Sequence, residues 1–392
     1  MTKTNSISFL GIVIVMLICS CKKEKVFTKK TVITKTVSSV KYAKGFEIQR
    51  FKDYKKLVIK SPYENSNAIF EYILLGKNTN TIVNFKQKPI YIPIQKMVVT
   101  STTHIPMVEL LKEEKSLIGF PHTQYVSSEK TRKLIDDGVI KEIGKESSLN
   151  TEILLDLQPE LVVGYSVSSA DKTLNTVQKA GIPVIYNGDW LEETPLGRAE
   201  WIQFFGVLFD KEKEADSIFT SIEKNYREAK KIALNTKTQP TILSGAMMSK
   251  DMWSLPAGES FVATFLKDAN LHYLWENTKG KGSLSLSFES VLDKAQHADF
   301  WIAPGYFSSK EQLLKSNKHY AKFKAFKNDN IFTPSTKKGK TGGVIYYELA
   351  PTRPDLVLKD LIKITNPSLL RDYELTFFER MSDTQNSSKG SQ

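Results

Sequence analysis

The sequence predicts an α/β protein made of two similar lobes that one long helix connects. Residues 211–234 contain neither Gly nor Pro, and their apolar side chains recur at helical spacing. On either side of this stretch, short apolar runs alternate with helical patterns, which is typical of parallel sheets covered by helices. The chain of 392 residues, 41% of them hydrophobic, can bury two cores. We therefore expect a stiff helix between two α/β lobes, with a ligand held between them.

The connecting helix is the clearest single element. Asp210 is expected to cap it, and Glu212 and Glu214 lie in the first turn, where the positive helix end favours acids. At about 1.5 Å per residue the helix would span about 36 Å. Its apolar face consists of Ala215, Ile218, Phe219, Ile222, Tyr226, Ala229 and Ala233.

The N-terminal residues indicate export and lipid attachment. Lys3 precedes an apolar run, Phe9 to Cys19, that is too short to span a membrane stably but fits the core of a signal peptide. An aliphatic residue three positions before Cys21 and a small residue directly before it resemble the bacterial lipobox. The resemblance implies cleavage before Cys21 and lipid attachment there, which would leave the mature chain no free cysteine. An ordinary signal peptide or a short anchor helix is the alternative.

Changes in composition predict the domain borders. In chain order these are a signal peptide (1–20), a Lys-, Thr- and Ser-rich tether (21–44), a β-rich segment (45–95), a first lobe (96–209), the connecting helix (210–235), a second lobe (236–380) and a disordered polar tail (381–392). The β-rich segment should form a small antiparallel set from strands at 46–51, 56–59, 68–75 and 81–85.

Each lobe shows strands and helices in alternation. In the first lobe we expect strands at 96–100, 116–120, 139–143, 160–164 and 182–186, helices at 104–112, 130–137, 150–157 and 171–180, and a further helix that Pro195 opens. In the second lobe we expect strands at 241–244, 300–303, 330–332 and 373–378, and helices at 260–266, 288–295, 312–317, 322–326 and from 353 onward.

The formal net charge is +12, and the lysines are scattered along the chain. A solvated surface explains scattered charge better than attraction to anionic lipids or ligands, which stays the alternative. Zinc-finger spacing, a basic zipper and RNA-binding aromatic signatures are missing, so we expect no nucleic-acid partner.

Three stretches in a fixed order carry a family resemblance. They are Asn150–Val163, then Ser287–Leu292 followed by Ala298–Ile302, and then Thr352–Leu361. Together they resemble the iron-siderophore and vitamin B12 periplasmic-binding family, the substrate-binding lipoproteins of ABC importers, over about residues 98–370. The resemblance implies two Rossmann-like lobes on a single backbone helix, which has no soft hinge and allows little lobe motion.

The resemblance also implies a function. The chain would be a monomeric, lipid-anchored protein of the cell envelope that captures an iron chelate (siderophore or haem) or a corrinoid. It would deliver this ligand to the permease and ATPase of an ABC importer and carry no cofactor of its own. Glu152 and Glu289 each lie in the first turn of a short helix, at matching places in the two lobes. The helix dipole alone would favour acids there, whereas the resemblance implies that each pairs with an arginine of the permease.

The ligand should lie at the carboxyl ends of the strands, where open α/β sheets bind small molecules. Flat aromatic faces suit porphyrin, corrin or aryl-chelate surfaces, although any one aromatic could simply be packing. Trp201 and Trp301 lie inside periodic elements and are expected in the core. From the loops 101–104, 122–125, 165–168, 189–190, 248–253, 305–307 and 342–347 we select Thr103, His104, Tyr125, Tyr165, Trp190, Trp253 and Tyr306 as ligand contacts.

Two other functions remain as alternatives. A zinc or manganese receptor of an ABC importer would clamp the ion with His and carboxylates, but only His104 and His122 fall at expected cleft loops. A hydrolase would use Ser166, yet the stretch 164–168 lacks the closing glycine of a nucleophile elbow. Gly339-Lys340-Thr341 is similar to part of a phosphate loop, but Pro334 occupies the first glycine position. We therefore expect neither an enzyme nor a bound metal.

Overall fold

The computed structural model describes residues 40–64, 66–79, 88–145, 148–166, 172–249 and 251–384. All of these residues belong to one compact unit. The predictions for the signal peptide, for lipidation of Cys21, for most of the tether, for a strand at 81–85 and for the end of the tail lie outside the described residues.

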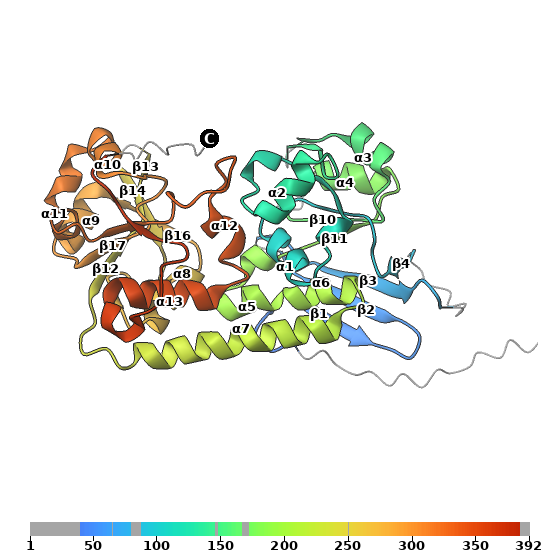
Figure 1. The fold of residues 1–392 in the computed structure, drawn as a ribbon, viewed down its shortest axis with the longest axis horizontal. Coiled ribbons are helices and arrows are strands. Elements are labelled where there is room, and N and C mark those ends of the chain that lie inside the picture. The colour runs from blue at the N-terminus through green and yellow to red at the C-terminus, as the bar shows by residue number, and fades with distance from the viewer. Residues whose placement is uncertain are drawn as a thin grey trace, which may run out of the picture. The chain divides into compact units, whose positions relative to one another are not determined.

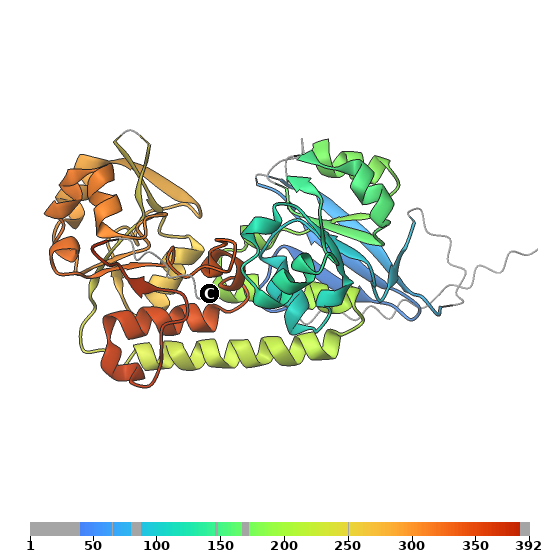
Figure 2. The ribbon, with the colours of Figure 1, turned by 45° about the horizontal axis from the view of Figure 1, so that its top comes forward.

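A four-stranded sheet precedes the first lobe. Strands β1 (Phe46–Arg50), β2 (Lys55–Lys60) and β3 (Ile69–Gly76) are antiparallel, as predicted. The unpredicted β4 (Ile90–Ile92) pairs parallel with the end of β3, so the set is not wholly antiparallel. Apolar side chains of these strands, among them Ile48, Leu57 and Leu74, are buried and join the core of the first lobe. Figure 2 shows the three blue strands beside that lobe.

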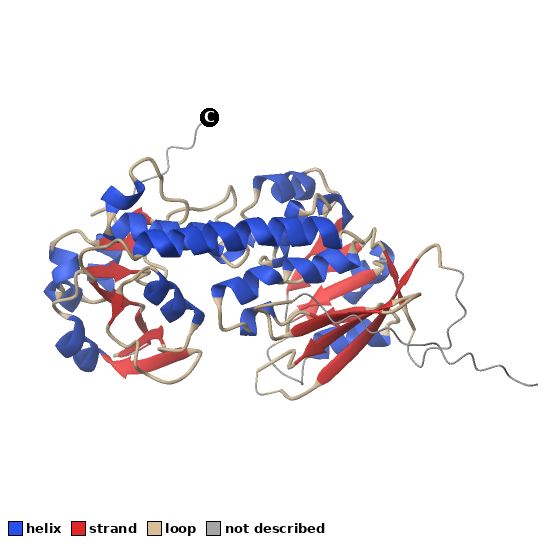
Figure 3. Cartoon of the chain, turned by 90° about the horizontal axis from the view of Figure 1, so that it is seen from below, coloured by secondary structure: helices blue, strands red, loops and turns tan. Residues whose placement is uncertain are grey.

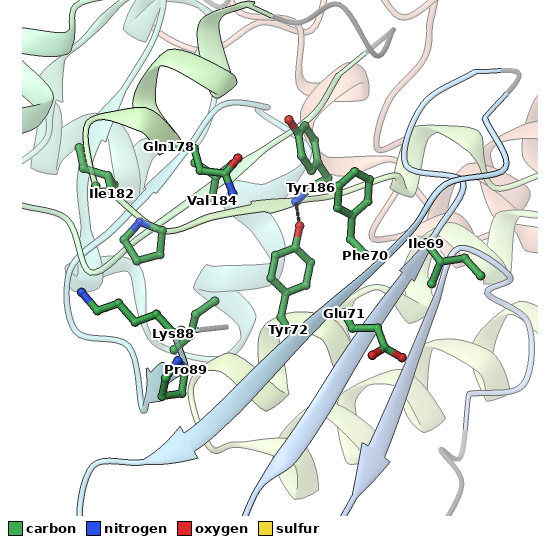
Figure 4. Close-up of a pocket in the computed structure, with 13 residues that line it drawn as sticks. Ile69, Phe70, Glu71, Tyr72, Lys88, Pro89, Gln178, Ile182, Val184 and Tyr186 are labelled. Carbon is green, nitrogen blue, oxygen red and sulfur yellow. Dashed lines mark hydrogen bonds between the residues drawn. The ribbon is translucent and has the colours of Figure 1, made fainter. Parts of the chain in front are cut away.

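The added sheet reaches the edge of the first-lobe sheet through β3. The Tyr72 hydroxyl accepts a hydrogen bond from the Tyr186 backbone N–H (3.4 Å), and the rings of Phe70 and Tyr186 lie 5.2 Å apart. Beside this contact is a crevice of about 490 Å³ whose lining includes Ile182 and Val184 (Figure 4). All of its lining residues belong to the added sheet or to the first lobe, so it is not a site between lobes.

The first lobe has a five-stranded parallel sheet in the order β11-β10-β5-β6-β7. Its central strand β5 is completely buried, as expected for a parallel sheet covered on both faces. The strands are β5 (Met97–Val99), β6 (Leu117–Phe120), β7 (Lys141–Glu142), β10 (Leu161–Gly164) and β11 (Val184–Tyr186). The helices are α1 (His104–Leu110), α2 (Glu129–Asp136), α3 (Thr151–Leu157), α4 (Lys172–Lys179), α5 (Pro195–Glu200) and α6 (Ile202–Leu208). A small hairpin, β8 (Gly144–Lys145) and β9 (Ser148–Leu149), precedes α3.

The connecting helix α7 (Glu212–Ala233) is continuous over 22 residues. Figures 1 and 3 show it running along α5, α6 and the later helix α13, all of which it contacts. Its first half buries Phe219 and Ile222 in the first-lobe core, and its second half buries Tyr226 and Ala229 in the second-lobe core. The cap prediction was wrong: Lys211 occupies the N-cap position, and the Asp210 carboxylate instead pairs with Lys55 Nζ (2.8 Å).

The second lobe repeats the architecture with the strand order β15-β12-β17-β18-β19. Strands β12 (Thr241–Ser244), β15 (His272–Tyr273), β17 (Phe300–Ile302) and β18 (Ile331–Thr333) are parallel, and β19 (Glu379–Arg380) is antiparallel at the edge. The helices are α8 (Phe261–Asp268), α9 (Phe288–Ala295), α10 (Lys310–Ser316), α11 (Lys324–Lys327), α12 (Ile345–Leu349) and α13 (Pro354–Thr365).

The predicted strand at 373–378 is wrong. The backbone N–H groups of Thr376, Phe377 and Phe378 donate to the buried Asp360 carboxylate of α13 rather than to a neighbouring strand. The Asp360 side chain thus binds the backbone of this stretch, and strand pairing with β18 begins only at β19.

A three-stranded antiparallel sheet that the sequence did not predict also belongs to the second lobe. It consists of β13 (Ala246–Ser249), β14 (Met252–Pro256) and β16 (Ser283–Ser287). Trp253 lies in β14 and is 0% exposed. Its indole N–H donates to the Ser244 carbonyl (3.0 Å), and its ring centroid lies 5.3 Å from that of Trp301. Trp253 is therefore a core residue, and its prediction as a ligand contact is wrong.

Residues 41–45, here called the N-terminal strap, are bound to the lobes although the sequence placed most of them in a tether. The backbone N–H groups of Lys41, Tyr42 and Ala43 donate to the Glu200 carboxylate at 2.6–2.8 Å. The Tyr42 hydroxyl donates to Glu223 of α7 (2.6 Å). Because charged acceptors make the stronger hydrogen bonds, these contacts fix the chain well before residue 45.

Candidate functional site

The two lobes meet through a buried carboxylate. Glu348 of α12 accepts hydrogen bonds from the backbone N–H groups of Ser127 (2.7 Å) and Ser128 (2.9 Å), and Ser128 is the N-cap of α2 in the first lobe. Glu348 is 2% exposed, and this burial raises the pKa of its carboxyl to about 7 although the two hydrogen bonds oppose the shift. The contact places an acid of one lobe at a helix N-terminus of the other.

The loop before α12 extends this contact. Thr341 Oγ1 donates to the Gln124 carbonyl (2.8 Å), and Lys340 pairs with Asp136 of α2 (3.1 Å). A Cβ atom added to Gly343 would lie 2.1 Å from the Tyr125 carbonyl oxygen, so only glycine permits this approach. The structure thus brings together the loops at 122–125 and 342–347, both of which the sequence placed at the cleft.

A second contact between lobes surrounds α5. The Arg198 guanidinium lies 3.6 Å from the centroid of the Phe261 ring of α8, a cation–π geometry. Glu193 pairs with Lys281 of the second lobe and with Lys44 of the N-terminal strap (3.3 Å). The hydrogen bond from Lys281 lowers the pKa of Glu193 below its usual range. This carboxylate therefore connects three parts of the chain.

Beside this second contact lies a cavity of about 780 Å³, a volume within the range of small-molecule sites. Three parts of the chain form its walls. They are residues 44–45, 60–61, 63–64 and 66–67 of the N-terminal segment, residues 188–198 around the short 3₁₀ helix η3 (Asp189–Leu191), and residues 256–262 with 281–283 of the second lobe. Its basic side chains are Lys44, Lys60, Arg198 and Lys281, its acidic ones Glu64, Glu192 and Glu193, and its aromatic ones Tyr63, Trp190 and Phe261.

Trp190 is the one predicted ligand contact that lines this cavity. Its side chain is half-buried, and its indole N–H is buried without a hydrogen-bond partner among the described residues. A buried unpaired donor costs free energy that a ligand acceptor would recover.

Thr103 and His104 lie deeper than predicted. His104 is 0% exposed and packs on Phe205, with ring centroids 5.6 Å apart. Burial lowers its pKa, which keeps the imidazole neutral. A ligand in the cavity cannot reach this ring, so the prediction for His104 is wrong. The Thr103 hydroxyl donates to Asp189 (2.8 Å) and thereby supports the residue that precedes Trp190.

Tyr125, Tyr165 and Tyr306 do not line the 780 Å³ cavity. Tyr125 is 54% exposed where the first-lobe loop meets Gly343, and Tyr306 is 69% exposed with its ring 6.0 Å from that of Tyr347. Tyr306 instead borders an apolar surface hollow of about 560 Å³ with Met247, Met248 and Phe307. The Tyr165 side chain is half-buried, and its backbone N–H donates to Thr100 Oγ1 (3.2 Å). Ligand contact by these tyrosines stays a prediction.

Glu152 and Glu289 occupy equivalent helix positions. Each is exposed and is the second residue of its helix, α3 or α9. The N-caps Asn150 and Ser287 already accept hydrogen bonds from these helix ends. In the described part of the chain neither glutamate forms an ion pair. Both carboxylates are therefore available to a partner.

Among the residues that the structure describes, no group of three or more His, Cys, Asp or Glu side chains is placed to hold a metal ion. Within the same residues, no helix has the length and apolar character needed to cross a bilayer.

Comparison with known proteins gives relatives along nearly the whole chain. An uncharacterized lipoprotein of Methanocaldococcus jannaschii is 24% identical over 412 aligned residues, which cover 96% of each chain. A possible iron-binding (periplasmic solute-binding) protein from Staphylococcus epidermidis superimposes with a TM-score of 0.55 at 18% identity, covering 70% of this chain and 99% of that one. The triscatecholate siderophore binding protein of Bacillus subtilis, complexed with ferri-bacillibactin, superimposes with a TM-score of 0.52 at 19% identity, covering 71% and 95%.

These structures share the two lobes and the helical backbone, which confirms the predicted fold class. The family model described as periplasmic binding protein matches residues 97–335, which take in the first lobe, α7 and most of the second lobe. The added strands β1–β4 precede this match. The chain belongs to the periplasmic binding protein family and is a binding protein rather than an enzyme.

Proposed function

We propose that this protein is the substrate-binding lipoprotein of an ABC importer and that it captures an anionic iron chelate of the siderophore type. The observation that carries this proposal is the 780 Å³ cavity between the lobes, with basic and aromatic side chains on its walls. Haem and a corrinoid are the competing ligands.

The chemistry of the walls favours a charged aryl chelate. Ferric complexes of catecholate ligands carry negative charge on a surface of aromatic rings. Lys60, Arg198 and Lys281 offer charge-assisted hydrogen bonds to such a surface, and Tyr63 and Trp190 offer flat faces. The iron-related names of the two solved structures agree with this ligand class.

Capture requires little rearrangement. Because α7 is continuous and is buried in both lobe cores, it holds the lobes without an extended linker that could act as a hinge. The cavity is thus largely preformed, and a preformed site loses less binding energy to ordering. Release to the transporter then depends on docking rather than on a chemical step.

Docking would use the two exposed glutamates. Glu152 and Glu289 lie one in each lobe at the same helix position, which suits recognition by two equivalent halves of a permease. We further propose that a lipid on Cys21 anchors the protein at the cell envelope, in agreement with the lipoprotein relative. A monomer is sufficient for this scheme.

The test is a binding panel with the mature protein carrying Cys21→Ser. Tryptophan fluorescence is followed during titration with a ferric triscatecholate, a ferric trishydroxamate, haem and cobalamin. Saturable quenching by the triscatecholate, with a Kd of micromolar or below, is the expected result. If only haem or only cobalamin quenches the fluorescence, that compound and not a siderophore is the ligand. Thermal stabilisation by zinc or manganese alone would identify a metal receptor, and ester hydrolysis that Ser166→Ala abolishes would identify a hydrolase.

A further inference from the structure

One wall of the cavity is formed by residues 60–61, 63–64, 66 and 67, and it lies outside the family match, which begins at residue 97. These residues connect β2 to β3 of the added sheet and reach the cavity beside η3 and the start of α8. The added sheet therefore contributes directly to the site between the lobes.

This wall is fixed in place. Lys60 N–H donates to the Gly45 carbonyl (2.8 Å), and Ser61 N–H donates to the Ala68 carbonyl (2.9 Å), so both ends of the connection are tied. Pro62 is buried and packs on Gly188, where an added Cβ would lie 3.7 Å from the proline Cα. These hydrogen bonds and this packing hold the described ends of the connection against the rest of the first lobe.

Two side chains of this wall suit an anionic aryl ligand. The Lys60 side chain is exposed and lines the cavity, and its ammonium group pairs with Glu47 at 3.0 Å. Tyr63 is half-buried and presents a phenol ring to the same space. Lys281 of the second lobe lines the same cavity and adds a second cation. A ligand that fills the cavity would therefore meet cations from the added sheet and from the second lobe.

We propose that the added N-terminal sheet determines ligand specificity: Lys60 and Tyr63 form a third wall that selects iron chelates with an anionic aromatic periphery over neutral ones. This inference rests on the proposed function, and it assigns a role to the strands that the family match leaves out.

The experiment compares two ligands on matched variants. The control for Lys60→Met is Lys56→Met. Lys56 lies in the same strand and pairs with Glu71, but it does not line the cavity. Tyr63→Ala is paired with Tyr91→Ala, which removes an exposed tyrosine of β4 outside the cavity. Each protein is titrated with ferric triscatecholate and with ferric trishydroxamate at two salt concentrations.

For the triscatecholate we expect Lys60→Met to weaken binding about fivefold and to reduce its salt dependence, and Tyr63→Ala to weaken binding about tenfold. Lys60→Met should leave the neutral trishydroxamate unchanged, and the two control variants should bind as the parent does. If the parent binds the triscatecholate and both Lys60→Met and Tyr63→Ala bind it with the same affinity, this inference is wrong and the proposed function still stands. A parent that binds no chelate would overturn both. Unchanged thermal midpoints establish that the variants are folded.

Discussion

The Glu348 carboxylate of the second lobe accepts a 2.7 Å hydrogen bond from the Ser127 backbone N–H of the first lobe. The chain between these residues passes through α7 and most of the second lobe. One contact between the two lobes therefore depends on a single buried carboxylate.

Stability should depend on pH through Glu348. Its pKa is raised from 4.5 to about 7 in the folded protein, so the folded state binds more protons than the unfolded state between these values. Stability from this group is fully present below about pH 4.5 and is lost as the pH rises through 7, by up to about 3 kcal/mol. As the pH rises from 4.5 to above 7, we expect the Tm of the parent to fall relative to the Tm of Glu348→Gln. Thermal scans from pH 4.5 to 8 check this, and parallel pH profiles of the two proteins would contradict it.

Gly343 should not tolerate a larger residue. Gly343→Ala places a Cβ against the Tyr125 carbonyl and should cost about 1–3 kcal/mol as the two loops separate. Gly282→Ala is the matched control, because an added Cβ there meets nothing within 4 Å. Urea unfolding compares the two, and equal midpoints would mean that the loops adjust without cost.

The two glutamates proposed to dock the permease should affect transport but not binding. Glu152→Ala combined with Glu289→Ala is expected to leave ligand affinity within twofold of the parent and to reduce uptake by tenfold or more, because the charged contacts to the permease are lost. Glu129→Ala combined with Glu311→Ala removes two other exposed first-turn acids and serves as the control. Full uptake by the first double variant would exclude the docking role.

A break in helix α7 should reduce stability and ligand binding more than a change of one of its exposed side chains does. Ser221 is exposed near the middle of the helix. Ser221→Pro should cost about 3 kcal/mol or more and weaken ligand binding, because it breaks the helix between the two lobe cores. Ser221→Ala should be neutral or slightly stabilising. Calorimetry with ligand titration tests both, and ligand binding by Ser221→Pro at parental affinity would show that the helix does not set the spacing of the lobes.

Local patterns predicted much of the fold. The 3.6-residue period marked α7, and short apolar runs marked the buried strands around β5 and β12. Pairing between distant segments left no such pattern: Trp253 was assigned to a loop because nothing local reveals that β14 pairs with β16. The stretch at 373–378 has strand composition, yet Asp360 satisfies its backbone.

The sequence prediction reached one residue that lines the candidate cavity. Trp190 was selected because it lies just past the end of a strand, and it lines the 780 Å³ cavity, although ligand contact by it stays a prediction. Lys60, Tyr63 and Lys281 reach the same cavity from segments that are distant in sequence, and Glu348 meets Ser127 across the lobes. Such relationships exist only in three dimensions, and no motif marks them.

The N-terminal strap has a mechanical meaning. Glu200 and Glu223 grip residues 41–43 where α5 and the middle of α7 lie side by side. A pulling force on the chain at residue 41 would therefore act on helix α7, which is buried in both lobe cores. It would not separate one lobe from the other.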